Sequence, residues 1–281
     1  MAIQVNGTTV IDNSRVLSNV TGLKTINGTS ILWSGDIAAG GAPVWNPAST
    51  PDVTITSTST WTKPTLADDT YIFVYMVGGG GGSLVSTSTW QKGGSGAGAA
   101  IFSGLSQEFP SSIAFTVGSG GSANYGAGAG GNGGNTTCTV DTVVYTATGG
   151  FGGTNDSNAK AGGGGSFAGT YSGRSPFVMY PNTSPGTTTD NYSVYPQAGG
   201  VGSFSSTPNV LFGGAGGVGA VNGSGTTYSP GTSLYAGDGG HNNTTGSNFK
   251  NGGVPGGGGG ATPGGLGGTG GAGNVRIWYL V

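Results

Sequence analysis

The chain has very little charge, one cysteine, one histidine and no long hydrophobic run. Its 281 residues include eight basic and ten acidic side chains, and the net charge is −2. Because phosphate binding needs a stripe of Lys and Arg, we expect no binding to nucleic acid. A membrane-spanning helix needs a run of about 18 apolar residues, so we expect no membrane insertion.

The scarcity of cysteine and histidine also argues against a catalytic or metal site. Cys138 lacks a second thiol for a disulfide or a cysteine-based metal site, and its alternating context, TTCTV, favours a packed side chain. His241 and Asp238 supply too few ligands for a metal ion, and no strained nucleophile motif accompanies them. Asp156, Asp190 and Asp238 stand singly rather than as a glycosidase pair. We therefore predict a protein that is not an enzyme and that uses no metal or cofactor.

The first residues, MAIQVNGTTV, lack the basic and apolar regions of a secretion signal. We therefore expect synthesis in a cytoplasm without a signal peptide.

Glycine is abundant but unevenly distributed. Residues 1–76 contain six of the 65 glycines, and the rest of the chain contains the other 59. So much glycine is typical of disorder, but the low charge and the recurring strand-like runs argue against it. The shift in composition predicts a docking segment at 1–37, a proline-containing linker at 38–52 and a glycine-rich domain at 53–281.

Short apolar pieces alternate with Asn-Gly and Thr-Gly turn signals in residues 1–37. Strands this short cannot bury a core alone, so the segment is either a frayed extension or a region that becomes stable when copies from several chains wrap together. We favour the second interpretation, because the apolar periodicity would be wasted on an exposed tail. The candidate oligomerisation and docking residues are Ile3, Val5, Val10, Ile11, Leu17, Ile26, Ile31, Leu32 and Trp33.

The glycine-rich domain contains several runs with strand character and no helical period. Tyr71 to Val77 is almost continuously apolar, which is typical of a strand buried on both faces. Further strands are predicted at 99–102, 113–117, 136–140, 143–147 and 275–280. The predicted fold class is all-β, an N-terminal short-strand segment followed by a β-sandwich.

The glycine blocks repeat in threes, as in GGNGGN at 130–135, GGAGGVG at 213–219 and GGLGGTGGAG at 264–273. Three residues per turn is the period of the polyproline II helix, whose backbone groups all point outward. Two glycines per triplet would allow contact on two sides, with the third residue on an outer edge. We therefore predict polyglycine-II-like layers that cap the sandwich, and the alternative for 148–274 is a disordered spacer.

Aromatic residues cluster in long insertions within the glycine-rich region. Tyrosine with Ser, Gly and Asn is the composition of antibody binding loops, and flat aromatic rings suit sugars, so these insertions are candidate receptor-binding loops. The alternative is that the aromatics fill a core that glycine cannot. The candidate residues are Trp90, Tyr171, Arg174, Phe177, Tyr180, Tyr192, Tyr195, Tyr228, Tyr235, His241 and Phe249.

Residues 57–281 resemble the glycine-rich domain at the tips of bacteriophage tail fibres. The resemblance is carried by Trp61-Thr62-Lys63-Pro64, YIFVYMVGGGGG, GGSGAGAAIFSGL, FTVGSGG, VVYTATGGFGG and the closing GGAGNVRIWYLV. The N-terminal segment is similar to parts of marine phage fibre proteins. The resemblance implies a virion protein made in the host cytoplasm, usually a homotrimer with an adhesive tip.

From this we expect a non-enzymatic virion appendage that docks on other virion proteins through residues 1–37. Its partner at the tip would be a host cell-surface glycan or outer-membrane component. One alternative is a structural capsid decoration or tail component that binds no receptor. Another is an ice- or surface-binding protein, which would need flatter and more regular arrays of Thr or Ala.

Overall fold

The computed structural model describes residues 3–5, 8–11, 45–85, 90–126, 128–154, 165–168, 209–221, 228–241, 251–261 and 267–280. The chain forms two compact units, Met1–Trp45 and Asn46–Val281. The division lies inside the expected linker.

The first unit contains an antiparallel hairpin of β1 (Ile3–Val5) and β2 (Thr8–Ile11). This confirms the two strands expected around the Asn6-Gly7 turn signal. Of the candidate docking residues, Ile3 and Val5 lie on β1, and Val10 and Ile11 lie on β2. Those outside the described residues are Leu17, Ile26, Ile31, Leu32 and Trp33.

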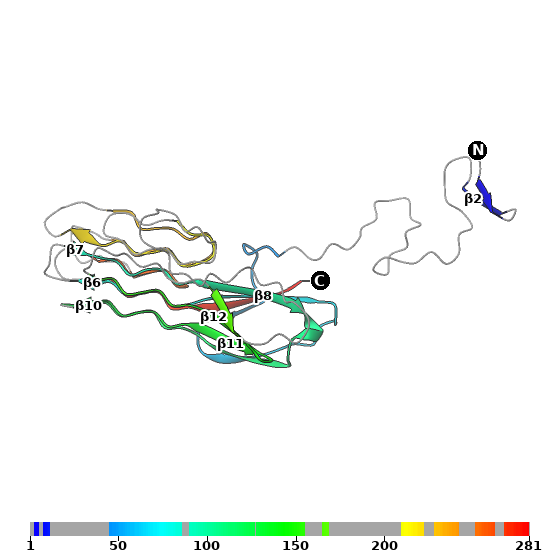
Figure 1. The fold of residues 1–281 in the computed structure, drawn as a ribbon, viewed down its shortest axis with the longest axis horizontal. Coiled ribbons are helices and arrows are strands. Elements are labelled where there is room, and N and C mark those ends of the chain that lie inside the picture. Colours follow the sequence, from blue (N-terminus) through cyan, green and yellow to red (C-terminus); the bar gives the residue numbers. More distant parts are fainter. Residues whose placement is uncertain are drawn as a thin grey trace. The chain divides into compact units, whose positions relative to one another are not determined.

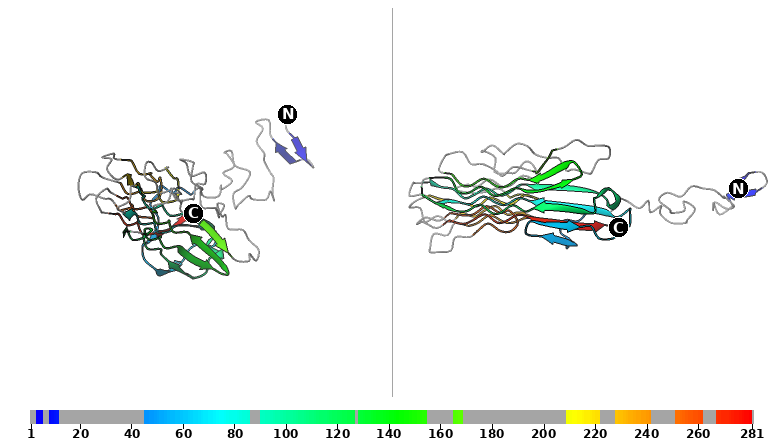
Figure 2. Two further views of the ribbon diagram at one scale, coloured as in Figure 1. Left: turned by 60° about the vertical axis from the view of Figure 1, so that its left-hand side comes forward. Right: turned by 90° about the horizontal axis from the view of Figure 1, so that it is seen from below.

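The second unit is a β-sandwich of two antiparallel sheets, which confirms the predicted fold class (Figures 1 and 2). The four-stranded sheet has the order β3 (Val53–Ile55), β15 (Asn274–Leu280), β5 (Tyr71–Val77) and β8 (Ala99–Leu105). The five-stranded sheet has the order β13 (Gly165–Ala168), β12 (Val143–Ala147), β11 (Thr136–Val140), β9 (Ser112–Thr116) and β4 (Ser59–Thr62). The described residues contain one helical turn, the 3₁₀ turn η1 (Ser106–Glu108).

The strands predicted at Tyr71–Val77, Thr136–Val140 and Val143–Ala147 have those bounds in the structure. The other predicted strands are present but shifted or longer by a few residues. Burial on both faces of β5 is also confirmed: Val74 faces the sandwich core, while Tyr75 is buried on the opposite face.

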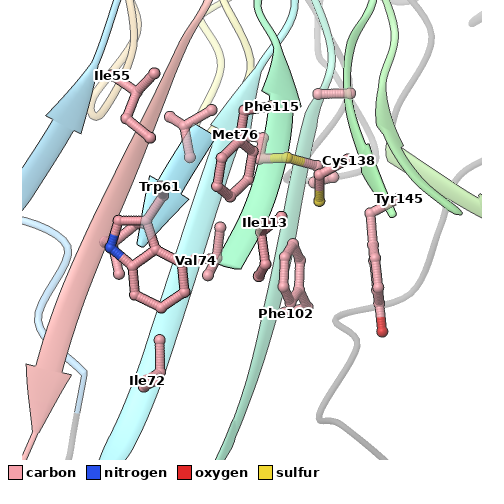
Figure 3. Packing of buried hydrophobic residues seen from close by; sticks show 14 of the residues in the cluster. Ile55, Trp61, Ile72, Val74, Met76, Phe102, Ile113, Phe115, Cys138 and Tyr145 are labelled. Carbon is pink, nitrogen blue, oxygen red and sulfur yellow. The ribbon is translucent and has the colours of Figure 1, made fainter. Parts of the chain in front are cut away.

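The sandwich core is filled by side chains from both sheets (Figure 3). Phe102 stacks on Tyr145 with 4.0 Å between ring centroids and on Phe109 with 6.2 Å, so β8 joins the two sheets. Cys138 is buried in the same cluster, as expected, and burial raises the pKa of its thiol. The thiol is therefore neutral and packed rather than reactive.

Lys63, from the Trp-Thr-Lys-Pro motif, closes one end of the sandwich. Its Nζ donates to the carbonyl oxygens of Ser106, at 2.8 Å, and Phe109, at 2.9 Å. The Ser106 carbonyl also accepts from the Phe109 N–H, and the ammonium group adds a charged donor to it and to the Phe109 carbonyl at the end of η1. Trp61 of the same motif donates from Nε1 to the hydroxyl of Tyr279 at 3.1 Å. The motif therefore links the β4 edge of the five-stranded sheet to β15 and to η1, which follows β8 of the four-stranded sheet.

The outer face of the four-stranded sheet is covered by other parts of the second unit. The Tyr75 hydroxyl donates to the carbonyl of Phe212, whose ring stacks on Tyr235 at 5.2 Å. Burial raises the pKa of Tyr75, and the nearby Arg276 charge opposes this in part. Residues of the expected linker also reach this sheet, since the Trp278 Nε1 donates to the Ser49 carbonyl at 3.2 Å.

Beyond the sandwich the strands continue as glycine helices, seen in Figure 1 as long parallel wavy segments. The run 78–84 follows β5, and its N–H groups turn to a new neighbour at each residue and return to the same neighbour every third residue. The first neighbour is the run 92–98, where the carbonyls of Gly98, Ser95 and Lys92 accept from Gly78, Gly81 and Leu84 in that order. The second is the run 130–135, where the carbonyls of Gly134 and Gly131 accept from Gly79 and Gly82. The third is the run 267–273, where the carbonyls of Gly271 and Gly268 accept from Gly80 and Ser83. This threefold period confirms the predicted polyglycine-II-like geometry.

Six runs surround the central run 78–84. It donates to 92–98, 130–135 and 267–273, which are antiparallel to it, and it accepts from 118–124, 149–153 and 256–260. Each of the six also bonds to the next one around the ring; for example, Gly130 donates to Gly153 at 2.8 Å and Gly270 donates to Gly121 at 2.9 Å. We expected a glycine helix to contact neighbours on two sides, but the central run has neighbours on all sides. The reason is that its five consecutive glycines have no side chain that would keep a neighbouring backbone away.

The third residues of the triplets take two different positions. Asn132 and Asn135 lie on the exposed outer edge, as predicted, and their Oδ1 atoms accept from Gly152 at 2.9 Å and Gly149 at 2.8 Å. Ala215 and Val218 are fully buried, so the outer-edge prediction was wrong for them. Their run bonds on one side to 92–98 and on the other to 237–240, and this additional layer covers them.

Candidate binding end of the glycine array

The array has a distal end, where the chain turns back toward the sandwich. We define it by β6 (Leu84–Val85), β7 (Trp90–Gln91), β10 (Asn124–Tyr125), β14 (Ala220–Val221) and the bridge between Ala261 and Gly267. Figure 1 shows β6, β7 and β10 at the end of the array away from the sandwich. β6 pairs with β10 in parallel and β7 pairs with β14 antiparallel, so segments far apart in sequence meet there.

Four of the candidate receptor-binding residues lie within the described part of the chain. The backbone of Trp90 lies at the distal end, opposite Val221. Tyr228 and Tyr235 are half-buried and His241 is exposed. Those outside the described residues are Tyr171, Arg174, Phe177, Tyr180, Tyr192, Tyr195 and Phe249.

Tyr235 packs against the outer face of the four-stranded sheet. Its ring stacks on Phe212, and its carbonyl oxygen accepts from Nη1 of Arg276 at 2.9 Å. This contact matches the alternative in which a loop aromatic fills space inside the molecule.

The segment 169–208, which contains most of the candidate residues, is flanked by the described residues Ala168 and Asn209. Ala168 pairs with Val144 of β12, and the Asn209 Oδ1 accepts from the Thr232 N–H at 3.0 Å. There are therefore two candidate regions, the distal end and the segment 169–208, of which the structure describes the first.

A family model for a glycine-rich domain matches residues 53–280. The chain belongs to this family. The search of curated proteins gave no match. The matched glycine-rich domain starts at β3 and ends at the last residue of β15, so it spans the sandwich and the array together.

The described part of the glycine-rich domain contains no group of three or more His, Cys, Asp or Glu side chains placed to share a metal ion. Among the described residues, no helix is long and apolar enough to cross a bilayer.

One aromatic residue at the distal end was missed by the sequence analysis. Tyr125 of β10 is 57% exposed. The predicted binding aromatics lie in long insertions, whereas Tyr125 lies in the short turn SANYGAGAGG between two glycine runs. The signal was an aromatic residue within a turn between glycine blocks, where no core is available to bury it.

Proposed function

We propose that the protein is a non-enzymatic phage virion appendage, a tail fibre or fibre tip, that presents aromatic residues to a host-surface receptor or glycan. The observation that carries this proposal is the ring of six hydrogen-bonded runs around the central run 78–84. Such an array is a stiff spacer because each internal backbone group is bonded to a neighbour. It holds the turns of the distal end away from the sandwich, as a fibre tip requires. Membership of a glycine-rich domain family also fits this role.

The first unit supports a proposed role in assembly. An isolated two-stranded hairpin is at best marginally stable in water, and β1 pairs with β2 alone among the described residues. Additional strands from other copies would stabilise it, so we propose a homotrimer that docks on other virion proteins through residues 1–37. The proposed location is the virion, after synthesis in the host cytoplasm.

The test is the binding of labelled, purified protein to cells of the host bacterium. We expect saturable binding that is lost when Tyr180 and Tyr192 are replaced with Ala. Val254→Ala is the matched control, because Val254 is 62% exposed and lies outside both candidate regions. Because charge is scarce in the protein, binding should change little with salt. Wild-type protein that ignores host cells would contradict the receptor-binding role.

A structural role in the virion is the second candidate, and one exposed apolar pair favours it. Leu211 and Leu234 follow the bridged residues Val210 and Ser233, and they are 39% and 65% exposed. Exposed apolar side chains that lie side by side are typical of a surface that another protein covers. Under this alternative, Leu234→Ala would weaken incorporation into particles while host-cell binding would be absent in the wild type.

A further inference from the structure

The exposed ring of Tyr125 is exceptional in this domain. Among the aromatic side chains whose burial the structure describes, it is the one that is mostly exposed, at 57%. The other Phe, Tyr and Trp side chains whose burial the structure describes are buried or half-buried. Tyr125 lies on β10, at the distal end of the array (Figure 1).

The backbone around Tyr125 is fixed on both sides. The Asn124 N–H donates to the Ser83 carbonyl at 3.0 Å, and the Gly126 N–H donates to the Val85 carbonyl at 2.9 Å. The Nδ2 of Asn124 donates to the Ala129 carbonyl at 2.8 Å, which closes the turn that follows β10. The ring is therefore presented by the array itself rather than by a long loop.

The hydroxyl of Tyr125 is held loosely across the distal end. It lies 3.4 Å from both the carbonyl oxygen and the amide nitrogen of Gly267. These distances are at the long end of the hydrogen-bond range, so a hydroxyl from a ligand could replace them at little cost. A phenol that is mostly exposed and whose hydroxyl is loosely held can stack on one face of a ligand and form a hydrogen bond with a polar group beside that face.

We propose that Tyr125 is a stacking platform for a neutral pyranose sugar, with the apolar C–H face of the sugar on the ring. A sugar hydroxyl would bond to the Tyr125 hydroxyl and to the backbone of Gly267. This inference rests on the proposed function, because it assigns a ligand class and a residue to the distal end of a receptor-binding tip.

A neutral sugar fits this place better than a cation. Recognition of a quaternary ammonium group uses a cage of several aromatic rings. Tyr125 is the single mostly exposed ring among the described aromatic side chains, which suits one-sided stacking. A rigid aromatic side chain also loses little conformational entropy on binding.

Saturation-transfer difference NMR on the full chain tests the platform. The probes are millimolar methyl glycosides of glucose, galactose and mannose, together with N-acetylglucosamine and phosphocholine. We expect wild-type protein to saturate the ring protons of at least one sugar. Tyr125→Ala should abolish the signal, whereas Tyr125→Phe should retain it because the ring face remains. Val254→Ala is the control on another exposed side chain, at 62% exposure, and a circular dichroism spectrum like that of the wild type shows that each variant is folded.

Three NMR outcomes would overturn the inference: sugars saturated equally by Tyr125→Ala, no sugar saturated by the wild type, or saturation of phosphocholine through Tyr125 in place of the sugars. Host-cell binding separates this inference from the proposed function. Tyr125→Ala should lower the affinity for cells about tenfold, as expected for the loss of a stacked aromatic contact. If Tyr125→Ala binds cells as the wild type does, only the platform is wrong. If the wild type binds no cells, the receptor-binding function is wrong whatever the NMR shows.

Discussion

At Val77 and Gly78 the chain passes from one kind of packing to another. In the sandwich, side chains such as Val74 and Phe102 fill the space between two sheets, which in such folds lie about 10 Å apart. In the array, the continuations of the same sheets bond directly, since Gly79 donates to Gly134 and accepts from Gly150. The same two layers are therefore held together by side-chain packing in the sandwich and by backbone hydrogen bonds in the array, where glycine has no side chain to separate them.

The two regions also differ in what stabilises them. Burial of a large apolar side chain contributes about 1.5–3 kcal/mol to the sandwich. In the array, a hydrogen bond contributes about 1 kcal/mol, which is similar to the cost of ordering the backbone of one residue. The array therefore has little stability of its own, and we infer that it depends on the sandwich strands that hold its runs in register.

The largest expected effect is the loss of the strand that both regions share. Deletion of residues 274–281 removes β15, which pairs with β3 and β5 and places Val275 and Ile277 in the core. It also releases the run 267–273 from the sandwich. We expect the glycine-rich domain to unfold, with loss of cooperative thermal melting and rapid proteolysis. A truncated protein that stays soluble and resists protease would contradict the proposed dependence.

Removal of a core side chain should weaken the sandwich and, through it, the array. Phe102→Ala leaves a cavity between Phe109 and Tyr145 and should lower the free energy of unfolding by about 3–5 kcal/mol. Urea unfolding followed by tryptophan fluorescence measures the change. Amide exchange of the run 78–84 should accelerate in the same variant. Unchanged exchange there would show that the array is stable by itself.

Addition of one methyl group to the array should also be costly. A Cβ on Gly81 would overlap the carbonyl oxygen of Phe151, which belongs to a rigid neighbouring run. Gly81→Ala should therefore lower the free energy of unfolding by about 3 kcal/mol, although alanine loses less entropy than glycine on folding. Ser122→Ala, at an exposed position of the run 118–124, is the control and should change stability by less than about 0.5 kcal/mol. Equal stability of the two variants in urea would contradict the close packing.

The smallest expected effect concerns the exposed edge of the array. Asn132→Ala removes the acceptor for the Gly152 N–H and should cost about 1 kcal/mol in urea unfolding. Asn132→Asp keeps an acceptor oxygen and should restore most of the loss. If both variants are as stable as the wild type, water replaces the side chain without cost.

Much of the sandwich followed from local pattern. The runs at Tyr71–Val77 and Thr136–Val140 are bounded by turn or glycine signals, so their strands could be predicted to the residue. β3, β4, β13 and the short distal strands were missed because three or four residues, or glycine itself, give no period to detect. The exposed Tyr125 was missed because it lies in a short turn between glycine runs and not in one of the long aromatic insertions.

The sequence by itself determined that glycine forms ordered threefold helices, because a triplet period and outward-pointing backbone groups follow from the residues alone. It also determined an all-β fold with little charge. Only the tertiary structure decided which runs are neighbours, and hence that Asn132 is exposed while Val218 is buried. The reason is that a polyglycine II helix makes no internal hydrogen bonds. Each run takes its partners from distant parts of the chain, and the sandwich strands select them.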